Sequence, residues 1–298
     1  MNNPLYVRKE DGSKEEFNEK KLYESLIKSG AEPHQAEKIV TQVIDQVREG
    51  EGREGHGSDP TANTTTALEI YHRAYGILKD AARVVAARYS LRRSLLEFGP
   101  TGFPFEQYVG ELFKAKWNYE VLVGQIVLGG CVPHEVDVVA WNPDKLMMAE
   151  VKYHSDAGSK TDLKVSLYVK ARYDDLKDTV FDYGGIKQKI SEGWLITNTR
   201  FTETAVHYAE CQGLKMLSWD YPKTGNMQEL IEYTQLHPIT CLTTLSPSDK
   251  RTLMDRNIVL VKTLFEKKSE LKSIGFTEDQ INELFDEASE VLKTVPAN

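Results

Sequence analysis

Two carboxylates and one amine lie in a part of the chain where a half-buried strand would place apolar side chains. In HEVDVVAW, residue Asp137 stands between two valines, and in MAEVKYH, Glu150 and Lys152 are separated by one valine. Side chains alternate between the two faces of a strand, so Glu150 and Lys152 share one face. With Asp137 on the neighbouring strand, the pattern predicts that the three groups converge.

Such a cluster suits the hydrolysis of a phosphodiester. Mg²⁺ or Mn²⁺ prefers oxygen ligands, and a bound ion lowers the pKa of an attacking water. We predict Asp137, Glu150 and Glu106 as metal ligands, with Lys152 positioning the water or stabilising the phosphate. Glu106 lies in FEQYVGELF, at the edge of an amphipathic helix, and could also order Lys152. The alternative is a cross-strand salt bridge on a solvated face.

The segment that must position these groups, residues 100–222, has the pattern of a mixed α/β sheet. An amphipathic helix is predicted through Phe105, Tyr108, Val109, Leu112 and Phe113. Strands are predicted over 119–128, 134–141 and 146–153, the last two joined by the turn NPDK. A helix near 167–178, a buried strand over 193–198, a helix over 201–213 and a strand over 214–219 complete the segment.

The order of these motifs resembles a known superfamily. The Asp, then Glu-x-Lys signature is similar to that of the PD-(D/E)xK nucleases, and FEQYVGELFKAKWNYEV, VDVVA, EVKYH and GWLITNTRFTETAVHYAE resemble the Mrr-type restriction endonuclease domain over about 102–221. The resemblance implies an active site at Glu106, Asp137, Glu150 and Lys152, and DNA as the substrate. The proline of the motif name is absent before Asp137.

The first 99 residues predict a small, mainly helical domain with a β-hairpin. LYVRKEDGSKEEF contains an Asp-Gly turn signal, and apolar residues recur at helical spacing after it. These are Ala36, Ile39, Val40, Val43, Ile44 and Val47, then Leu68, Tyr71, Tyr75 and Leu78, then Val85, Ala86 and Tyr89. Basic residues on the hairpin and the start of the first helix could bind a phosphate, although surface hairpins often carry such residues.

This segment resembles the ATP-cone domain, in which a β-hairpin lid covers a bundle of helices. The resemblance implies that ATP or dATP binds as an allosteric ligand, at Val7, Arg8, Lys9, Asn18, Lys21 and Thr65. A threonine near Thr65 is expected to cap a later helix. Glu10 stands where the family has a second basic residue, and its carboxylate would repel a triphosphate unless it faces solvent.

Residues 223–298 predict two helix-turn-helix units with capping signals at Ser246-Pro247 and Thr277-Glu278. The segment loosely resembles a helix-hairpin-helix module, with Asn257 at the position of the hairpin glycine. Asparagine tolerates the left-handed turn that such a hairpin needs. A packing or oligomerisation bundle is the favoured alternative because the segment is acidic.

Composition limits these interpretations. The formal net charge is −8, with 15 basic and 16 acidic residues in 1–99, 13 and 17 in 100–222, and 9 and 12 in 223–298. DNA binding would therefore depend on local basic patches, bound cations and more than one subunit. Three widely spaced cysteines suggest no disulfide framework, and the sequence contains no apolar run long enough to span a membrane. We expect a cytoplasmic protein that does not bind membranes.

Together, these patterns predict a multi-domain α/β protein that binds DNA and an adenine nucleotide. Its expected domains are a nucleotide-binding domain over 1–99, a nuclease domain over 100–222 and a helical domain over 223–298. We expect a homo-oligomer, a dimer or tetramer, because one site cuts one strand. The alternatives are a nucleotide-responsive DNA-binding regulator and a scaffold, neither of which is catalytic.

Overall fold

The computed structural model describes residues 4–8, 13–50 and 64–293, and the chain forms two compact units that meet between Ser90 and Leu91. Residues 91–99, which the sequence analysis assigns to the first domain, belong to the second unit. The hydroxyl of Thr240 donates to the backbone oxygen of Ser94 over 2.8 Å, which ties this segment to the C-terminal part of the second unit.

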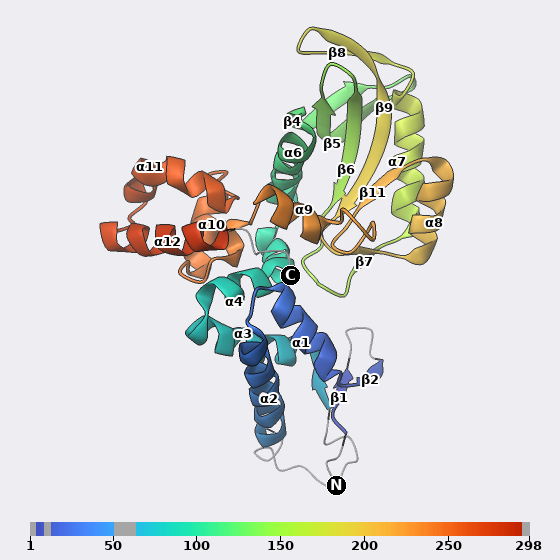
Figure 1. The fold of residues 1–298 in the computed structure, drawn as a ribbon. Helices are drawn as coiled ribbons and strands as arrows, with labels where there is room; N and C mark the ends of the chain where they lie inside the picture. Colours follow the sequence, from blue (N-terminus) through green and yellow to red (C-terminus); the bar gives the residue numbers. More distant parts are fainter. Residues whose placement is uncertain (1–3, 9–12, 51–63, 294–298) are drawn as a thin grey trace. The chain divides into compact units, whose positions relative to one another are not determined.

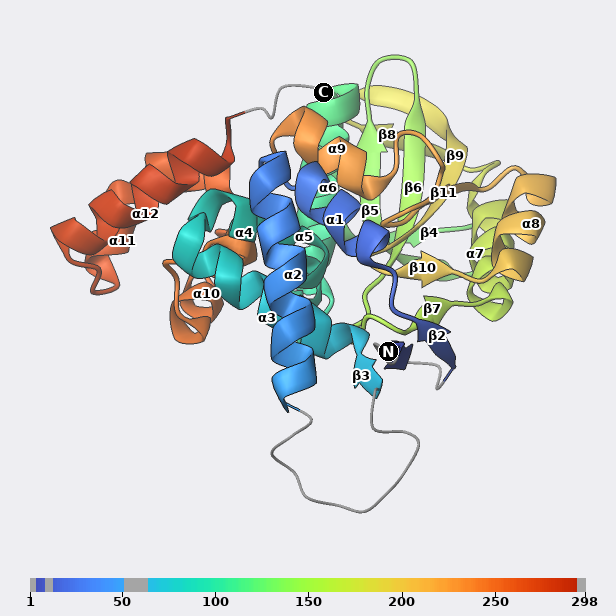
Figure 2. The same cartoon turned by 60° about the horizontal axis from the view of Figure 1, so that its bottom comes forward.

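The first unit combines a small sheet with four helices (Figure 2). Strand β1 (Tyr6–Arg8) pairs antiparallel with β2 (Lys14–Glu16) and parallel with β3 (Thr64–Thr66). The helices are α1 (Glu19–Lys28), α2 (Pro33–Gly50), α3 (Ala67–Ala81) and α4 (Arg83–Tyr89). The antiparallel strands and the helices confirm the predicted fold, whereas the Asp11-Gly12 turn lies outside the described residues.

The core of the first unit follows the predicted helical spacing in α2 and departs from it in α3. All six apolar residues predicted for one face of α2 are buried. In α3, however, Leu68 is 41% exposed, and the buried positions are Ile70, Ala74 and Leu78. The prediction for Leu68 was wrong because the N-terminal turn of α3 follows directly on β3 and places a different face toward the core.

The second unit is built on a six-stranded mixed sheet whose main path runs β11-β9-β6-β5-β4, with β8 paired to β9 (Figure 1). Its strands are β4 (Glu120–Leu128), β5 (Pro133–Trp141), β6 (Leu146–Lys152), β8 (Val180–Tyr183), β9 (Ile186–Thr197) and β11 (Lys215–Leu217). β4, β5 and β6 form an antiparallel meander, and β9 runs parallel to both β6 and β11. This arrangement confirms the predicted mixed sheet.

Helices cover both faces of this sheet (Figure 1). Helix α6 (Phe103–Trp117) packs on one face and buries all five residues predicted for its apolar side. Helices α7 (Leu163–Leu176) and α8 (Glu203–Gln212) lie on the other face, where Val169, Leu195 and Ala205 form part of one apolar cluster. The sheet is therefore buried on two sides, as its nearly continuous apolar strands require.

The hairpin of β8 and β9 was not predicted. It extends β9 backward to Ile186 and turns at Gly184 and Gly185, both of which have positive φ angles of 62° and 79°. Glycine adopts such angles without strain, which permits a two-residue turn. Two further strands, β7 (Lys160–Thr161) and β10 (Arg200–Phe201), form a separate parallel pair.

One buried amide joins three segments of the second unit. Asn198, which follows β9 and is fully buried, donates through Nδ2 to the backbone oxygens of Leu95 at 3.2 Å and His154 at 2.8 Å. Its Oδ1 accepts from the backbone nitrogen of His154 at 2.9 Å. The segment that leads out of the first unit is thus attached to the residues that follow β6.

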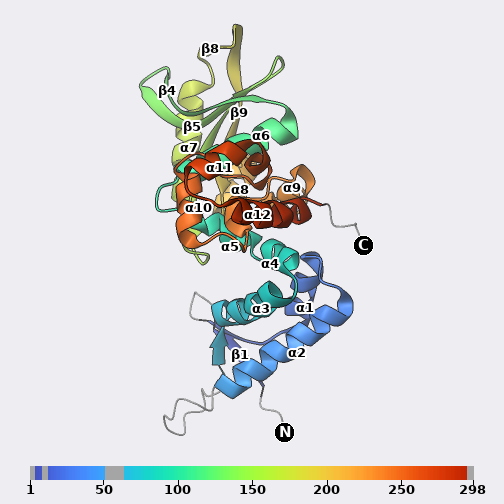
Figure 3. The ribbon, with the colours of Figure 1, turned by 90° about the vertical axis from the view of Figure 1, so that its left-hand side faces the viewer.

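The C-terminal part of the second unit is helical (Figure 3). Short α5 (Leu91–Ser94) and η1 (Leu95–Phe98) precede α6, whereas α9 (Met227–Thr234), η2 (Ile239–Cys241), α10 (Pro247–Met254), η3 (Val261–Lys267), α11 (Lys268–Ser273) and α12 (Glu278–Val291) follow the sheet. Ser246 and Thr277 form capping boxes at the starts of α10 and α12, as their sequence signals predict. Within the ranges given above, no helix has the length and apolar character needed to cross a bilayer.

Candidate functional site

Three of the four predicted catalytic residues lie close together in the second unit. Glu106 lies in the first turn of α6, Asp137 on β5 and Glu150 on β6, and each of the two strand carboxylates raises the pKa of Glu106. Glu135, two residues before Asp137 on the same strand face, adds a fourth negative charge. The alternation of side chains along β5 and β6 thus produces the cluster that the sequence predicts.

The carboxylate of Glu150 is held by two residues of α7 that the sequence analysis did not identify. The hydroxyl of Tyr168 donates to Oε1 over 2.6 Å, and the guanidinium of Arg172 binds Oε2. The Arg172 guanidinium also lies over the Tyr168 ring, 5.5 Å from its centroid. Tyr168 and Arg172 are four residues apart and therefore share one face of the helix. The sequence signal was this spacing, which predicts that the two side chains lie together on the helix but does not predict their contact with Glu150.

Burial and mutual repulsion raise the pKa of two of the carboxylates. The pKa of Glu106 rises to about 7 because the group is partly buried and faces Asp137, Glu135 and Glu150. The pKa of Asp137 rises to about 6, first through burial and then through Glu150. The backbone N–H of Val151, which donates to Asp137 Oδ2 over 2.7 Å, opposes this rise. Carboxyl groups with such values can exchange protons near neutral pH.

Lys152 is the predicted catalytic residue that makes no contact with the cluster. It lies at the end of β6 on the same strand face as Glu150, and it is exposed. Within the described part of the chain, its ammonium group forms no hydrogen bond or ion pair. Its positive charge helps to lower the pKa of His154, although burial of the imidazole is the larger cause. The cross-strand salt bridge proposed as the alternative therefore does not include Lys152.

The pairing of β4 with β5 is interrupted next to Asp137. Gly124 lies between Val123 and Gln125, which pair with Val138 and Val136, so it stands opposite Asp137. Its φ angle is +64°, and a Cβ atom built there would have no neighbour within 4 Å. A side chain at this position would be strained, so the positive φ angle favours glycine here.

The carboxylates fit a metal ion that keeps part of its water shell. Among residues 4–8, 13–50 and 64–293, no three His, Cys, Asp or Glu side chains are arranged to enclose an ion by themselves. Asp137 and Glu150 nevertheless offer two carboxylates whose mutual repulsion a cation would relieve. Mg²⁺ is commonly bound by one or two carboxylates together with water and substrate phosphate. The donor set is therefore of the kind that this ion uses.

The predicted nucleotide-binding residues of the first unit lie on the small sheet and at the start of α1. Arg8 is exposed on β1, whereas Val7 is buried, so only the backbone of Val7 could face a ligand. Asn18 is the N-cap of α1 and accepts from the backbone N–H of Lys21 over 3.1 Å. Lys21 Nζ donates to Glu15 Oε1 over 3.3 Å. Lys9 lies outside the described residues.

The helix cap predicted near Thr65 is at the next residue. Thr66 is the N-cap of α3 and forms a capping box with Glu69, whereas the Thr65 hydroxyl donates to Glu69 Oε2 over 2.7 Å. The pKa of Glu69 is lowered mainly by this bond from Thr65. Thr65 therefore orients the residue that completes the cap.

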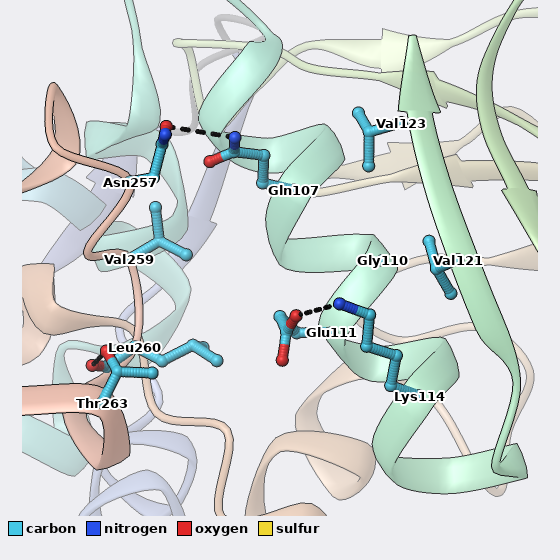
Figure 4. A pocket seen from close by; sticks show the side chains of 10 residues that line it. All are labelled: Gln107, Gly110, Glu111, Lys114, Val121, Val123, Asn257, Val259, Leu260 and Thr263. Atoms are coloured by element: carbon cyan, nitrogen blue, oxygen red, sulfur yellow. Dashed lines mark hydrogen bonds and ion pairs between the residues drawn. The ribbon is translucent and has the colours of Figure 1, made fainter. Parts of the chain in front are cut away.

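A cavity of about 300 Å³ lies between α6, β4 and the turn that contains Asn257 (Figure 4). At its mouth Gln107 Nε2 donates to Asn257 Oδ1 over 3.1 Å. Asn257 has a φ angle of +60°, the left-handed conformation expected for the hairpin position. However, the backbone N–H groups of residues 255–258 all donate to carbonyl oxygens of α10. They are thus occupied, which favours the packing interpretation over phosphate binding by this hairpin.

Comparisons with known proteins identify two parts of the chain. Residues 5–95 match the family model of the ATP cone domain, and residues 237–292 match the family model described as AF1548-like, C-terminal. The first match confirms the resemblance to an ATP cone. The second covers the C-terminal helices, for which the sequence analysis considered a helix-hairpin-helix module.

Relatives match over the larger part of the chain. An uncharacterized protein of Archaeoglobus fulgidus is 32% identical over 176 residues, which cover 59% of this chain and 95% of that protein. The crystal structure of AF1548, a protein of unknown function, is 30% identical with a TM-score of 0.52, covering 64% of this chain and 98% of that one. The structure of Can2 from Sulfobacillus thermosulfidooxidans in complex with cyclic tetra-adenylate is a distant match. It is 11% identical, covers 72% of this chain and 54% of that one, and has a TM-score of 0.31.

The Archaeoglobus fulgidus relative aligns over nearly its whole length, and the same family supplies the C-terminal match. The chain therefore belongs to the AF1548-like family and carries an ATP cone domain over residues 5–95.

Proposed function

We propose that the protein is a Mg²⁺- or Mn²⁺-dependent DNA endonuclease whose activity depends on ATP or dATP bound to its N-terminal domain. The observation that carries this proposal is the cluster of Glu106, Asp137 and Glu150, which α6, β5 and β6 bring together. A protein that needed these groups only for stability would gain little from burying mutually repelling carboxylates. Clusters of this kind are typical of functional sites.

Asp137 and Glu150 would hold the ion, together with water and the substrate phosphate. Glu106, which the sequence predicts as a third ligand, does not form a three-residue site with them among the described residues. When bound, such an ion lowers the pKa of an attacking water and offsets the charge of the phosphate. Glu106, which is partly buried and faces both carboxylates, would accept a proton from the water as the water oxygen bonds to phosphorus. The bond from phosphorus to the leaving oxygen would then break, and that oxygen would take up a proton from solvent water, while the proton held by Glu106 returns to solvent. Lys152, which is exposed and free of ion pairs within the described ranges, would bind the phosphate.

The test is cleavage of plasmid, linear, methylated and branched DNA with Mg²⁺ or Mn²⁺. We expect Asp137→Asn and Glu150→Gln each to reduce cleavage at least about 100-fold, a loss typical of removing one catalytic group. Both substitutions preserve shape, so a thermal unfolding curve should show that the variants fold. Unchanged cleavage in both folded variants would refute the proposal. Roles in defence against foreign DNA or in repair would follow from the preferred substrate.

Regulation by nucleotide is supported by the ATP cone match and by the exposed position of Arg8 on β1. The N-cap of α1 places a helix N-terminus near the same sheet, where a phosphate is stabilised. Calorimetry with ATP and dATP, followed by cleavage assays with and without each nucleotide, tests both binding and regulation. Absence of binding at millimolar nucleotide would reduce this domain to a scaffold.

A second candidate function is a nucleotide-responsive DNA-binding regulator without catalysis. The observation that favours it is that Tyr168 and Arg172 occupy both oxygens of Glu150. If these bonds persist in the presence of DNA, the carboxylate would be less available to an ion. DNA binding that is unaffected by Mg²⁺, with no product from any substrate, would favour this candidate. A dimer or tetramer is expected in either case, and size-exclusion chromatography with and without dATP tests it.

A further inference from the structure

A second cavity, of about 440 Å³, lies along the outer edge of the sheet beside β11. It is lined by the end of α6, by β9, by the end of α8 and by the loop after β11. Trp194 of β9 pairs with Ala149 of β6, one residue before Glu150. Since neighbouring residues on a strand point to opposite faces, the Trp194 side chain and the Glu150 carboxylate lie on opposite faces of the sheet. The cavity is therefore separate from the carboxylate cluster.

Two tryptophans line this cavity. The rings of Trp117 and Trp194 are 5.5 Å apart and inclined by 55°, and both side chains are half-buried. The ring of buried Phe113 packs against both indoles, with centroid distances of 5.1 Å to Trp117 and 5.6 Å to Trp194. The two indoles are inclined to one another, and both line the cavity, where each can contact a third ring. A rigid aromatic wall of this kind suits a planar ligand.

Polar groups lie at the rim of the same cavity. The hydroxyl of Tyr221 donates to Glu210 Oε1 over 2.8 Å, which orients a carboxylate that can still accept hydrogen bonds. Lys215, which pairs with Trp194 across the strands, is exposed and brings a positive charge. A carboxylate is the acceptor that recognises the amino group of cytosine, and an ammonium group binds phosphate. An aromatic wall, a carboxylate and an amine together match the parts of a nucleotide.

We propose that this cavity binds an unpaired nucleobase that carries an amino group, with the ring stacked on Trp117 and Trp194 and the amino group bonded to Glu210. The inference deepens the proposed function and rests on it, because it identifies unpaired bases as part of the DNA that the protein recognises. Base stacking on aromatic side chains is the usual means of holding single-stranded nucleic acid. An added peptide strand is less well suited, since β11 has only three residues.

The test is fluorescence anisotropy of the full-length protein with a labelled cytosine oligonucleotide of about 12 nucleotides, a length within the range of single-strand binding sites. EDTA is present, so that binding is measured without hydrolysis. Cytosine is chosen because an adenine ligand would also occupy the ATP cone. We expect Trp117→Leu to weaken binding by about 5- to 150-fold, which is the effect of losing one stacked base. Trp117→Tyr, which keeps a ring, should restore most of the affinity.

The matched control is Trp141→Leu. Trp141 stacks on Tyr183 at 5.1 Å and does not line this cavity, so its loss should leave binding unchanged. An abasic oligonucleotide should bind the wild type as weakly as cytosine DNA binds Trp117→Leu. Glu210→Gln should remove the preference for cytosine over thymine oligonucleotides. Competition by dCMP at comparable concentration would assign the site to free nucleotides, which have the same base, instead of DNA.

The two proposals can fail separately. Base-dependent binding that survives in Asp137→Asn, with no cleavage by the wild type, would leave the cavity assignment standing and refute the nuclease. Equal binding of cytosine and abasic oligonucleotides, unaffected by Trp117→Leu, would refute the cavity assignment and turn attention to a peptide at β11. Failure of the wild type to bind any oligonucleotide or dCMP would refute it as well.

Discussion

The hydroxyl of Tyr168 donates a hydrogen bond of 2.6 Å to Oε1 of Glu150, so a residue of helix α7 orients the carboxylate at the centre of the candidate site. Residues that hold a metal-binding carboxylate in place typically change metal affinity or activity by about 10- to 100-fold when they are removed. We therefore expect Tyr168→Phe to shift the Mg²⁺ dependence of cleavage by about tenfold. The matched control is Tyr173→Phe on the same helix, whose hydroxyl donates to Ser191 O at 3.3 Å. Identical Mg²⁺ titrations for Tyr168→Phe and the wild type would contradict this role.

Substitution of Lys152 should change the cleavage activity without changing the stability of the fold. It is exposed and forms no ion pair within the described ranges, so its removal should leave the melting temperature unchanged. We expect Lys152→Ala to lose at least about 100-fold in cleavage, because the amine would be needed to stabilise the phosphate. Lys187→Ala, at an exposed position in the β8–β9 hairpin, should cleave normally. Normal cleavage by Lys152→Ala would remove this residue from the mechanism.

We expect substitution of Glu106 by glutamine to increase the free energy of unfolding in a pH-dependent way. Its pKa in the folded protein is about 7, against an ordinary value of 4.5, because it is partly buried among other carboxylates. The folded state therefore binds the proton more tightly, and stability falls as the pH rises from about 4.5 to 7. Glu106→Gln should raise the free energy of unfolding at pH 8 by about 1–2 kcal/mol, after allowance for solvent screening, and by nothing near pH 4.

This prediction is measured by urea unfolding in EDTA at several pH values. The control is Glu111→Gln, on the same helix, where Glu111 forms an ion pair with Lys114 at 2.8 Å. That variant should show no gain above neutral pH. A Glu106→Gln variant that is less stable than the wild type at pH 8 would show that the glutamate is held by favourable contacts.

The nucleotide site predicts a difference between two neighbouring lysines. Both lysines lie in the first turn of α1, but Lys21 Nζ lies 3.3 Å from Glu15 of β2, whereas Lys20 points to Glu24 at 3.7 Å and has a side chain that is 80% exposed. We expect Lys21→Ala to weaken ATP binding about tenfold, since a charge-assisted bond to phosphate is lost. Lys20→Ala should bind ATP with unchanged affinity, as measured by calorimetry. Equal effects of the two substitutions would point to nonspecific attraction.

Local sequence patterns predicted the fold where one periodicity dominates. The buried faces of α2 and α6 and the strands β5 and β6 follow directly from apolar spacing, because each element packs one face against a core. The β8–β9 hairpin was missed although Gly184-Gly185 is a turn signal, since the polar residues of its strands obscure the alternation. Leu68 was misplaced because the direction in which α3 leaves β3 is set by the fold of the unit.

In the candidate site, too, local patterns predicted some features, whereas others depend on the tertiary fold. Alternation placed Asp137 and Glu150 on one face of the sheet, and the helix pattern placed Glu106 near it. The contacts of Glu150 with Tyr168 and Arg172 depend on how α7 crosses the sheet, which is a tertiary relationship that no local pattern contains. The raised pKa values of Glu106 and Asp137 depend equally on burial, which only the folded chain defines.

The side chain of Asn198 has a mechanical consequence. The same amide binds Leu95, the last residue of the ATP cone match and part of the segment that begins the second unit, and His154, two residues beyond Lys152. With all its bonds intact, this segment cannot be drawn aside without moving the end of the carboxylate-bearing strand. A displacement of this segment on nucleotide binding would therefore reach the backbone two residues from Lys152, the residue proposed to bind the phosphate.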